Sequence, residues 1–355
     1  MSRVRFFGSA LWFLAPGLRA SVLAVTLALA SWPQPVDASA GTRTSGTVRL
    51  FGVRYMDAHE FGRRFGLTQS WTVPLEQVRL TSRWTTLELT VHSVEAMLNG
   101  VRLFLSEPVV VSNGKLYLSR GDVDGLFTPI LSPSTVPVTR RPKTIVIDAG
   151  HGGSDPGNQN RALKLNEETF TLDVARRLQR LLAAAGFKVI MTRTGDRTVS
   201  LEKRAEIANR ANADLFISIH FNAFSDPGIA GAETYVMTPR LQHSTPQRER
   251  DRRMMTTRFD GNAHDRQNAL LGYHVHRALV GELRTPDRGL KRFRYSVLRS
   301  VDCPAVLVEA AFLSNPREAR AVTSASHRQR IAKAIASGVT RHVAVVERNL
   351  KSRRR

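Results

Sequence analysis

The chain of 355 residues is long enough for two modest domains, and its hydrophobic fraction of 42% excludes a wholly disordered protein. Lys and Arg number 52 against 30 Asp and Glu, a net charge of +22 that favours contact with polyanions. The single cysteine, Cys303, excludes an intrachain disulfide and the cysteine-rich zinc frameworks.

The N-terminus has the layout of a secretory signal peptide. Arg3 and Arg5 precede an apolar stretch at 20–30, and small residues at 38–40 form a cleavage pattern. The apolar stretch is shorter than the roughly 18 residues that a membrane span needs. We therefore predict a signal peptide at 1–40 and an exported protein, periplasmic or in the cell envelope; an uncleaved anchor is the alternative.

Residues 47–134 are predicted to form a small α+β accessory domain. Short strands are expected at 47–55, 86–91 and 101–105, and short helices at 58–65 and 120–127. Asn99-Gly100 and Asn113-Gly114 between apolar stretches each predict a hairpin turn. This region carries no metal-ligand motif, and a proline-rich, arginine-containing linker follows it at 135–142.

Residues 143–346 are predicted to form an α/β catalytic domain. The expected strands are 144–148, 188–192, 214–220, 233–237, 295–298 and 305–309; the expected helices are 167–185, 201–211, 265–283 and 326–343. This alternation favours a mostly parallel, helix-covered sheet. A basic tail at 347–355 follows.

Four ionisable residues fall where a parallel sheet collects its functional groups, outside the carboxyl ends of the strands. His151 follows the strand at 144–148, His220 and Glu309 each end a strand, and Glu167 opens a helix. Each also has an ordinary structural explanation. His151 could be a hydrogen-bonded residue of a glycine turn, Glu167 could interact with the helix dipole, and Glu309 could be a buried ion-pair partner. Together they describe a site, because two imidazoles and a carboxylate commonly bind a catalytic zinc ion.

The segment IVIDAGHGGSDPG at 145–157 resembles the opening motif of the zinc-dependent N-acetylmuramoyl-L-alanine amidases, the Amidase_3 family. Further motifs follow in the family's order: LDVARRL at 172–178, TRTGD at 192–196, LEKR at 201–204, ADLFISIHFNA at 213–223, GAETY at 231–235, PAVLVE at 304–309 and FLSNP at 312–316. The resemblance covers roughly residues 143–343. It implies that His151, Glu167 and His220 bind Zn²⁺ and that Glu309 is the catalytic carboxylate. The implied reaction is hydrolysis of the amide bond between the lactyl group of N-acetylmuramic acid and L-alanine in peptidoglycan.

Two departures and one ambiguity accompany this resemblance. Ala149 stands where the family usually has proline, and Ala311 where a glycine commonly precedes the phenylalanine. Glu168 adjoins Glu167, and spacing from the following helix favours Glu167 as the ligand. The region 47–134 more loosely resembles copper-amine-oxidase N-terminal-like modules, through 99–101 and 105–118, which implies a spacer or wall-contact role.

Two residues near predicted strand ends, Asn222 and Arg299, are candidates for substrate binding. The arginine-rich insert at 238–264 is interpreted either as a gating segment or as a disordered basic loop. Its arginines include Arg248, Arg250, Arg252 and Arg253.

We expect peptidoglycan as the partner and no nucleic acid, because no nucleic-acid motif accompanies the positive charge. A protein activator and peripheral contact with an anionic membrane or wall polymer stay open. Two alternative functions also stay open: a catalytically silent or activator-dependent peptidoglycan-binding protein, and a metallopeptidase that cuts within the stem peptide.

Overall fold

The computed structural model of the chain describes residues 47–245 and 252–353. The predicted signal peptide at 1–40 and two arginines of the insert, Arg248 and Arg250, lie outside these residues. In the described ranges, no helix combines the length and the apolar character that a membrane span requires.

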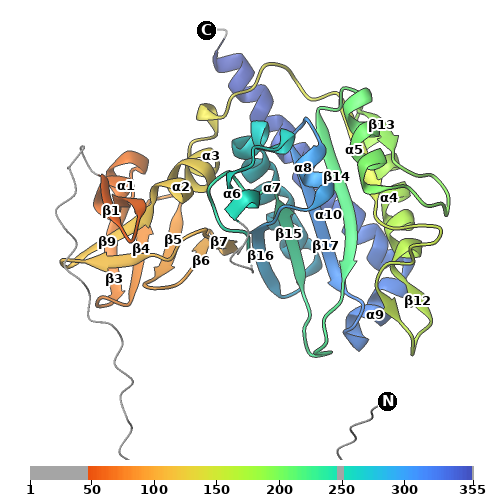
Figure 1. The fold of residues 1–355 in the computed structure, drawn as a ribbon, viewed down its shortest axis with the longest axis horizontal. Coiled ribbons are helices and arrows are strands. Elements are labelled where there is room, and N and C mark those ends of the chain that lie inside the picture. Colours follow the sequence, from red (N-terminus) through yellow and green to blue (C-terminus); the bar gives the residue numbers. More distant parts are fainter. Residues whose placement is uncertain (1–46, 246–251, 354–355) are drawn as a thin grey trace, which may run out of the picture. The chain divides into compact units, whose positions relative to one another are not determined.

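The centre of the fold is an eleven-stranded sheet in the order β13-β10-β14-β17-β15-β16-β7-β6-β5-β4-β3 (Figure 1). Its first six strands come from the predicted catalytic region: β13 (Lys188–Met191), β10 (Thr144–Ala149), β14 (Leu215–Asn222), β17 (Ala305–Phe312), β15 (Ala232–Val236) and β16 (Asp287–Arg292). The first four are parallel to one another, β15 is antiparallel to β17, and β16 is parallel to β15. The predicted α/β class with a mostly parallel sheet is confirmed.

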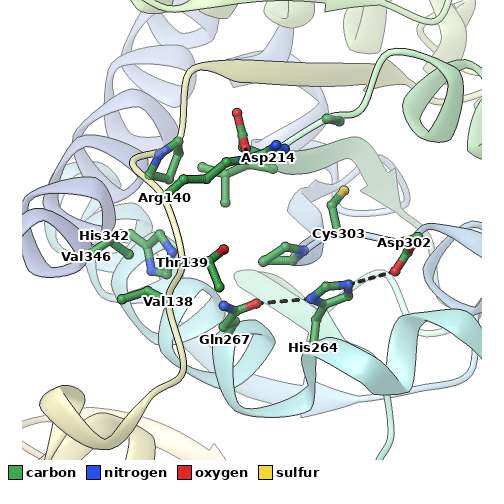
Figure 2. A pocket seen from close by; sticks show the side chains of 14 residues that line it. Val138, Thr139, Arg140, Asp214, His264, Gln267, Asp302, Cys303, His342 and Val346 are labelled. Atoms are coloured by element: carbon green, nitrogen blue, oxygen red, sulfur yellow. Dashed lines mark hydrogen bonds and ion pairs between the residues drawn. The ribbon is translucent and has the colours of Figure 1, made fainter. Parts of the chain in front are cut away.

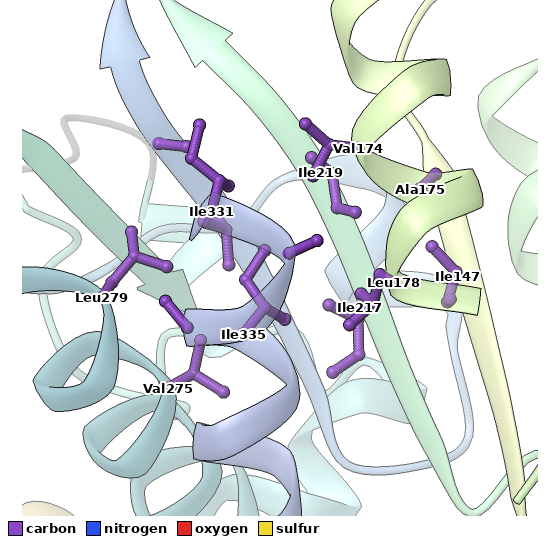
Figure 3. Close-up of a cluster of buried hydrophobic side chains, with 14 of the residues drawn as sticks. Ile147, Val174, Ala175, Leu178, Ile217, Ile219, Val275, Leu279, Ile331 and Ile335 are labelled. Atoms are coloured by element: carbon purple, nitrogen blue, oxygen red, sulfur yellow. The ribbon is translucent and has the colours of Figure 1, made fainter. Parts of the chain in front are cut away.

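Helices cover both faces of this part of the sheet. On one face lie α4 (Glu167–Ala184), α7 (Asp265–Leu283) and α10 (Ala325–Ser352). Each contributes apolar residues four apart, the spacing of one helical face: Val174 and Leu178, Val275 and Leu279, and Ile331 and Ile335, which meet Ile147, Ile217 and Ile219 of the strands (Figure 3). On the other face, α5 (Leu201–Arg210) and α8 (Ser296–Ser300) pack in a second apolar cluster.

The N-terminal region continues the same sheet. Leu103 of β7 lies opposite Leu290 of β16. From β7 (Val101–Phe104) the sheet proceeds as an antiparallel meander through β6 (Glu95–Leu98), β5 (Thr86–Thr90), β4 (Gln77–Thr81) and β3 (Thr68–Val73). The apolar core of this region includes Val236 and Leu290 of the catalytic half. The two predicted regions therefore share a sheet and a core, while the boundaries drawn between them stay a prediction.

A smaller sheet and several short helices complete the N-terminal region. The sheet has the order β1-β2-β9-β8 and consists of β1 (Thr47–Leu50), β2 (Val53–Asp57), β9 (Lys115–Ser119) and β8 (Val110–Ser112). The helices are α1 (Ala58–Phe65), α2 (Arg120–Asp122), the π-helical turn η1 (Val123–Phe127) and α3 (Thr128–Leu131).

Both predicted hairpin turns are confirmed. Asn99 and Gly100 connect β6 to β7, and Asn113 and Gly114 connect β8 to β9. All four have positive φ, between 48° and 74°, which is the backbone geometry that Asn-Gly turns provide.

Several predicted elements differ from the structure. The strand expected at 47–55 is the hairpin β1–β2, because the chain turns at Phe51 and Gly52. The strand expected at 295–298 is wrong: residues 296–298 begin helix α8, with Tyr295 as its N-cap, and the strand at this place in the chain is β16. Helix α10 continues through the first six residues of the predicted basic tail, and α9 (Pro316–Thr323) precedes it.

Candidate metal centre

Three side chains meet at the carboxyl edge of the parallel strands. His151 Nε2 and His220 Nδ1 are 3.2 Å apart, and Glu167 Oε1 lies 3.1 Å from the former and 3.0 Å from the latter. Within the described part of the chain, this is the one group of three or more His, Cys, Asp or Glu side chains whose donor atoms converge, all within 4.8 Å of one another.

The donor set and its spacing fit zinc. Tetrahedral zinc with bonds of about 2.0–2.2 Å has ligand atoms about 3.3–3.6 Å apart, close to the separations seen here. Three protein ligands of this kind leave a fourth position for water or substrate. The three side chains therefore form a candidate zinc site.

Neighbouring groups fix the orientation of these donors. Glu167 is fully buried at the first position of α4, and its carboxylate accepts from the backbone N–H groups of Asn158 at 2.8 Å and Phe221 at 3.0 Å. His151 Nδ1 lies 2.8 Å from Asp155 Oδ2, so that its Nε2 faces the site. Such partners hold ligand rings in place before a metal binds.

The turn that carries His151 has an unusual backbone. His151 has φ of 63°, a left-handed conformation that is uncommon for a residue with a Cβ atom. Two buried arginines hold the turn by its carbonyl groups: Arg193 donates to Ala149 and Gly150, and Arg204 donates to Ala149 and His151. The surrounding hydrogen bonds thus maintain a conformation that a free loop rarely adopts.

Asp148 anchors Arg204 beneath this turn. Its fully buried carboxylate accepts from Arg204 Nη1 at 2.7 Å, Thr192 Oγ1 at 2.7 Å and Ser218 Oγ at 2.8 Å. Burial favours a higher pKa for Asp148, but the charge and hydrogen bond of Arg204, with the hydrogen bond of Thr192, lower the pKa. Asp148 therefore stays ionised and supports the turn from below.

Two glycines allow the ligands to approach the backbone. A Cβ atom on Gly150 would lie 2.3 Å from the His220 ring. One on Gly157, which has φ of +67°, would lie 2.7 Å from both Glu167 Oε2 and the His151 ring. The glycines of this motif therefore make room for the three side chains.

Burial alone would raise the pKa of Glu167, but hydrogen bonds and positive charge from His151 and His220 lower it well below its usual range. The carboxylate is thus ready to bind a cation.

Glu309 stands beside the three donors. It lies next to His220 in the register of β14 and β17, and it is 9% exposed. Its Oε2 has no hydrogen-bond partner among the described residues. Burial raises the pKa of Glu309 well above its usual range, the charges of Glu167 and Glu233 raise it further, and Lys291 partly offsets them. A buried carboxyl group with an uncommitted oxygen is suited to proton transfer.

A cavity of about 470 Å³ opens next to these groups. His151, His220 and Glu309 line it together with residues at the starts of helices α5 and α8: Ser200, Leu201, Tyr295 and Val297. A ligand in this cavity would have access to both the donor atoms and Glu309.

Comparison with known proteins identifies the family. Residues 145–341 match the family model of Amidase_3, described as N-acetylmuramoyl-L-alanine amidase. The chain belongs to the Amidase_3 family. The prediction of an N-acetylmuramoyl-L-alanine amidase, drawn from its motifs, is confirmed at this level.

Individual Amidase_3 relatives agree. The chain is 31% identical over 217 residues to N-acetylmuramoyl-L-alanine amidase AmiA of Escherichia coli, an alignment that covers 56% of this chain and 75% of AmiA. It is 34% identical over 224 residues to N-acetylmuramoyl-L-alanine amidase AmiC of Neisseria meningitidis, covering 58% of this chain and 53% of AmiC. Among solved structures, the catalytic domain of CwlV, an N-acetylmuramoyl-L-alanine amidase from Bacillus (Paenibacillus) polymyxa, is 27% identical. That match has a TM-score of 0.48 and covers 57% of this chain and 99% of the CwlV chain.

The carboxylate that joins the two histidines of this Amidase_3 chain is Glu167 and not its neighbour. Glu168 Oε1 accepts from Asn166 Nδ2 at 3.2 Å, and Glu168 stands outside the converging group. The geometry thus agrees with the spacing argument from the sequence.

The two residues predicted to bind substrate have other contacts. Asn222 Nδ2 donates to Glu233 at 3.2 Å, and the guanidinium of Arg299 lies 5.2 Å from the centre of the Phe259 ring. Neither belongs to the described residues that line the cavity beside Glu309. Their role in substrate binding stays a prediction.

The structure describes residues 238–245 and 252–264 of the insert. They include helix α6 (Arg252–Thr256) and the short helix η3 (Asp260–His264). Arg299 of α8 reaches Met254 Sδ at 3.9 Å, and Arg294 donates to the carbonyl groups of Pro239 and Gln242. Gating by this segment stays a prediction.

A second cavity, of about 200 Å³, lies at the opposite edge of the sheet, near the amino ends of β14 and β17 (Figure 2). Its polar groups mostly satisfy one another: Arg140 pairs with Asp214, and His264 lies between Gln267 and Asp302. Burial raises the pKa of the Cys303 thiol to about 12, which makes it a poor nucleophile. This cavity therefore does not compete with the metal centre as an active site.

A network of charged residues behind the site was not predicted from the sequence. Glu233, Lys291 and Arg288 form a buried cluster next to Glu309, and Arg193 and Arg204 hold the His151 turn. Arg193, Arg204 and Glu233 lie inside the family motifs, whereas Arg288 and Lys291 lie outside them. Charged residues in isolation predict exposure, so neither group could be recognised as buried.

Proposed function

We propose that this chain is a zinc-dependent amidase that hydrolyses the bond between the lactyl group of N-acetylmuramic acid and L-alanine in peptidoglycan. The observation that carries the proposal is the convergence of His151, Glu167 and His220, with separations of 3.0 to 3.2 Å, beside the buried Glu309. Membership of the Amidase_3 family supplies the reaction class.

His151, Glu167 and His220 would hold the zinc ion. When bound, zinc lowers the pKa of a coordinated water towards about 7 and polarises a carbonyl group. The hydrogen bonds from Asn158 and Phe221 to Glu167 and the contact of Asp155 with His151 keep the donor atoms in place.

Glu309 would act as the proton carrier. Its carboxylate accepts a proton as water adds to the lactyl carbonyl carbon, and it returns that proton to the alanine nitrogen as the C–N bond breaks. The products are a free lactyl carboxylate and a stem peptide with a free amino terminus. The uncommitted Oε2 of Glu309 supports this role, because no hydrogen bond within the described chain has to break first.

The outer side of α10 is suited to an acidic wall polymer. Arg330, Lys333, Arg341, Arg348 and Lys351 are exposed at spacings of three, seven or eight residues, which places them along one helical face. At about 1.5 Å per residue, this stripe is about 32 Å long. The one acidic residue of α10, Glu347, pairs with Arg141. We propose that the stripe holds the enzyme on peptidoglycan through stem-peptide carboxylates.

Export to the periplasm or cell envelope belongs to the same proposal, because peptidoglycan lies outside the cytoplasmic membrane. The predicted signal peptide supports it. We further propose that the enzyme requires a protein activator and contacts an anionic membrane. Adding each of these two components to the purified enzyme tests these proposals.

Release of alanine amino groups from purified peptidoglycan tests the function. The mature protein is expected to release them, to lose this activity with a chelator and to regain it with zinc. Glu309→Gln is expected to abolish release while the protein keeps its zinc. If Glu309→Gln also loses zinc, Glu309 is a ligand and the assigned role is wrong. If the zinc-loaded wild type binds peptidoglycan without cleaving it, a binding protein replaces the amidase.

A further inference from the structure

Lys291 is a buried ammonium group close to the proposed active site. Its side chain is 8% exposed, and Nζ donates to Glu233 Oε1 at 2.7 Å. Nζ also lies 5.4 Å from the centre of the Phe104 ring and 5.7 Å from that of Tyr235. A charge removed from water in this way is tolerated only when it is paired, so the position of Lys291 is tied to that of Glu233.

Glu233 is the centre of a hydrogen-bonded cluster. Its side chain is 3% exposed; Oε1 accepts from Lys291 and from Arg288 Nε at 2.9 Å, while Oε2 accepts from Tyr235 Oη at 2.7 Å and Asn222 Nδ2 at 3.2 Å. Burial would raise the pKa of Glu233, but the charge of Lys291 and the hydrogen bonds from Lys291, Tyr235 and Arg288 together lower it. Glu233 is therefore a carboxylate anion inside the protein.

This anion faces the proposed catalytic carboxyl group. Glu233 on β15 lies directly opposite Glu309 on the antiparallel strand β17. Directly opposed residues point to the same side of a sheet with Cβ atoms about 4.5–5.5 Å apart, and like charges in such a pair repel. Lys291 supplies the compensating charge from the next strand, where it lies opposite Tyr235.

The N-terminal region provides the cover over this ammonium group. Phe104 belongs to β7, which pairs with β16 through Leu103 and Leu290. A Cβ atom on Gly289, where φ is +94°, would lie 2.6 Å from the Phe104 ring. Glycine at this position therefore allows the ring to pack against the strand that carries Lys291.

We propose that Lys291 is a positioning residue for the reaction, which holds Glu309 in place by compensating the charge of Glu233, and that Phe104 of the N-terminal region keeps this ion pair out of water. The proposal rests on the proposed amidase function. It gives the N-terminal region a part in catalysis through β16, in addition to any role as a spacer.

A double-mutant cycle on catalysis tests the charge compensation. Lys291→Met keeps the side-chain length and removes the charge, so kcat on soluble muropeptides is expected to fall about 10- to 100-fold with little change in KM. Glu233→Gln in the Lys291→Met background removes an anion that only the partly exposed Arg288 would still pair, and it is expected to restore kcat at least about fivefold. Phe104→Ser, which admits water, is expected to lower kcat, whereas Phe104→Leu is expected to retain most of it. Lys115→Met, at an exposed lysine of the N-terminal region, is the control and is expected to leave kcat unchanged.

A second cycle keeps the test independent of activity. In the metal-free protein, Lys291→Met is expected to lower the urea midpoint of unfolding, and Glu309→Gln in the same chain is expected to recover part of that loss. The proposal would be overturned if the effects of Lys291→Met and Glu309→Gln on the urea midpoint were additive. It would also be overturned if the double variant Glu233→Gln/Lys291→Met were no more active than Lys291→Met alone. If the wild type frees no alanine amino groups in peptidoglycan, the amidase function fails, while the unfolding cycle still decides whether Lys291 compensates these carboxylates.

Discussion

Arg292 Nη2 donates to Asp122 Oδ1 at 2.8 Å, and the two side chains are 3% and 0% exposed. The pair connects β16 of the catalytic half to α2 of the N-terminal region. Asp122 also accepts from the Ser106 backbone N–H at 2.9 Å and from Ser119 Oγ at 2.6 Å. A buried charge pair with this many partners makes the two regions depend on each other for stability.

Removing one partner of this pair is expected to be costly. Asp122→Ala leaves the Arg292 guanidinium buried without its anion and is expected to lower the free energy of unfolding by about 3–5 kcal/mol. Urea denaturation measures this change. The control is Glu88→Ala in the pair Arg79–Glu88, whose side chains are 47% and 46% exposed, where the expected loss is below about 1 kcal/mol. Equal losses in the two variants would contradict a stabilising role for the buried pair.

The approach of the His220 ring to Gly150 predicts a specific effect on metal binding. Gly150→Ala places a Cβ atom 2.3 Å from the ring, so His220 has to move and the affinity for zinc is expected to fall at least about tenfold. Titration with zinc against a competing chelator measures the affinity. Gly195→Ala is the matched control, because no atom lies within 4 Å of its added Cβ. An unchanged affinity in Gly150→Ala would mean that His220 is not a ligand in this position.

Two buried histidines predict loss of stability in acid. Burial, followed by Arg341, Arg277 and Arg348, lowers the pKa of His274 from 6.5 to about 4, and burial and His274 lower that of His342 to about 3. The unfolded chain therefore takes up protons below pH 6.5 that the folded chain binds only at lower pH. The stability that these neutral histidines contribute to the folded state is fully present above pH 6.5 and is lost as the pH falls towards 4.

His274→Leu measures the contribution of one of these groups. Because each pKa unit corresponds to about 1.4 kcal/mol, His274 accounts for about 3 kcal/mol of the loss between pH 6.5 and 4. The variant is expected to show a flatter pH dependence of unfolding over this range. Its replacement is tolerated at neutral pH, because His274 Nδ1 has no hydrogen-bond partner in the described chain. A pH profile identical to that of the wild type would show that folding does not shift the pKa of His274.

The basic stripe on α10 predicts a difference between polymer and soluble substrates. Replacing Lys333, Arg341, Arg348 and Lys351 with Gln is expected to reduce co-sedimentation with purified sacculi about tenfold at low salt. The effect on soluble muropeptides is expected to be small, because the stripe lies away from the cavity. At about 1 M salt the difference is expected to disappear through screening.

A charge-matched variant serves as control for the stripe. It carries Gln in place of four exposed cations of the N-terminal region, Arg54, Arg63, Arg83 and Lys115. If both variants lose the same affinity for sacculi, the net charge of the protein and not the α10 stripe determines binding. If the α10 variant keeps its binding to sacculi but loses binding to anionic vesicles, the stripe contacts a membrane and not the wall.

Much of the fold and the metal centre could be predicted from the sequence. The strands β10, β14 and β17 are apolar runs, and parallel strands bring their carboxyl ends to one edge, so His151, His220 and Glu309 had to lie near one another. The Asn-Gly turns are equally local, because their positive φ angles are a property of the two residues themselves.

The parts that depend on tertiary partners could not be predicted. The strand β16 reads DRGLKR, a polar pattern typical of a loop, and it is a strand because Asp122 and Glu233 neutralise its buried Arg292 and Lys291. The short apolar run at 295–298 is compatible with helix or strand, and packing against α5 decides for helix α8. Neither β16 nor β7 has a sequence pattern that indicates its pairing with the other, so the continuation of the catalytic sheet into the N-terminal region could not be predicted.

Mass spectrometry of the products from purified peptidoglycan shows whether the protein cuts the lactyl–alanine bond with the help of zinc. The protein is incubated with sacculi with and without a zinc chelator, and the released peptides and glycan are identified. We predict free stem peptides that begin with alanine and glycan with unsubstituted lactyl groups, both lost on chelation. Peptides cut within the stem would make the protein a metallopeptidase and contradict the account, as would release that persists after zinc is removed.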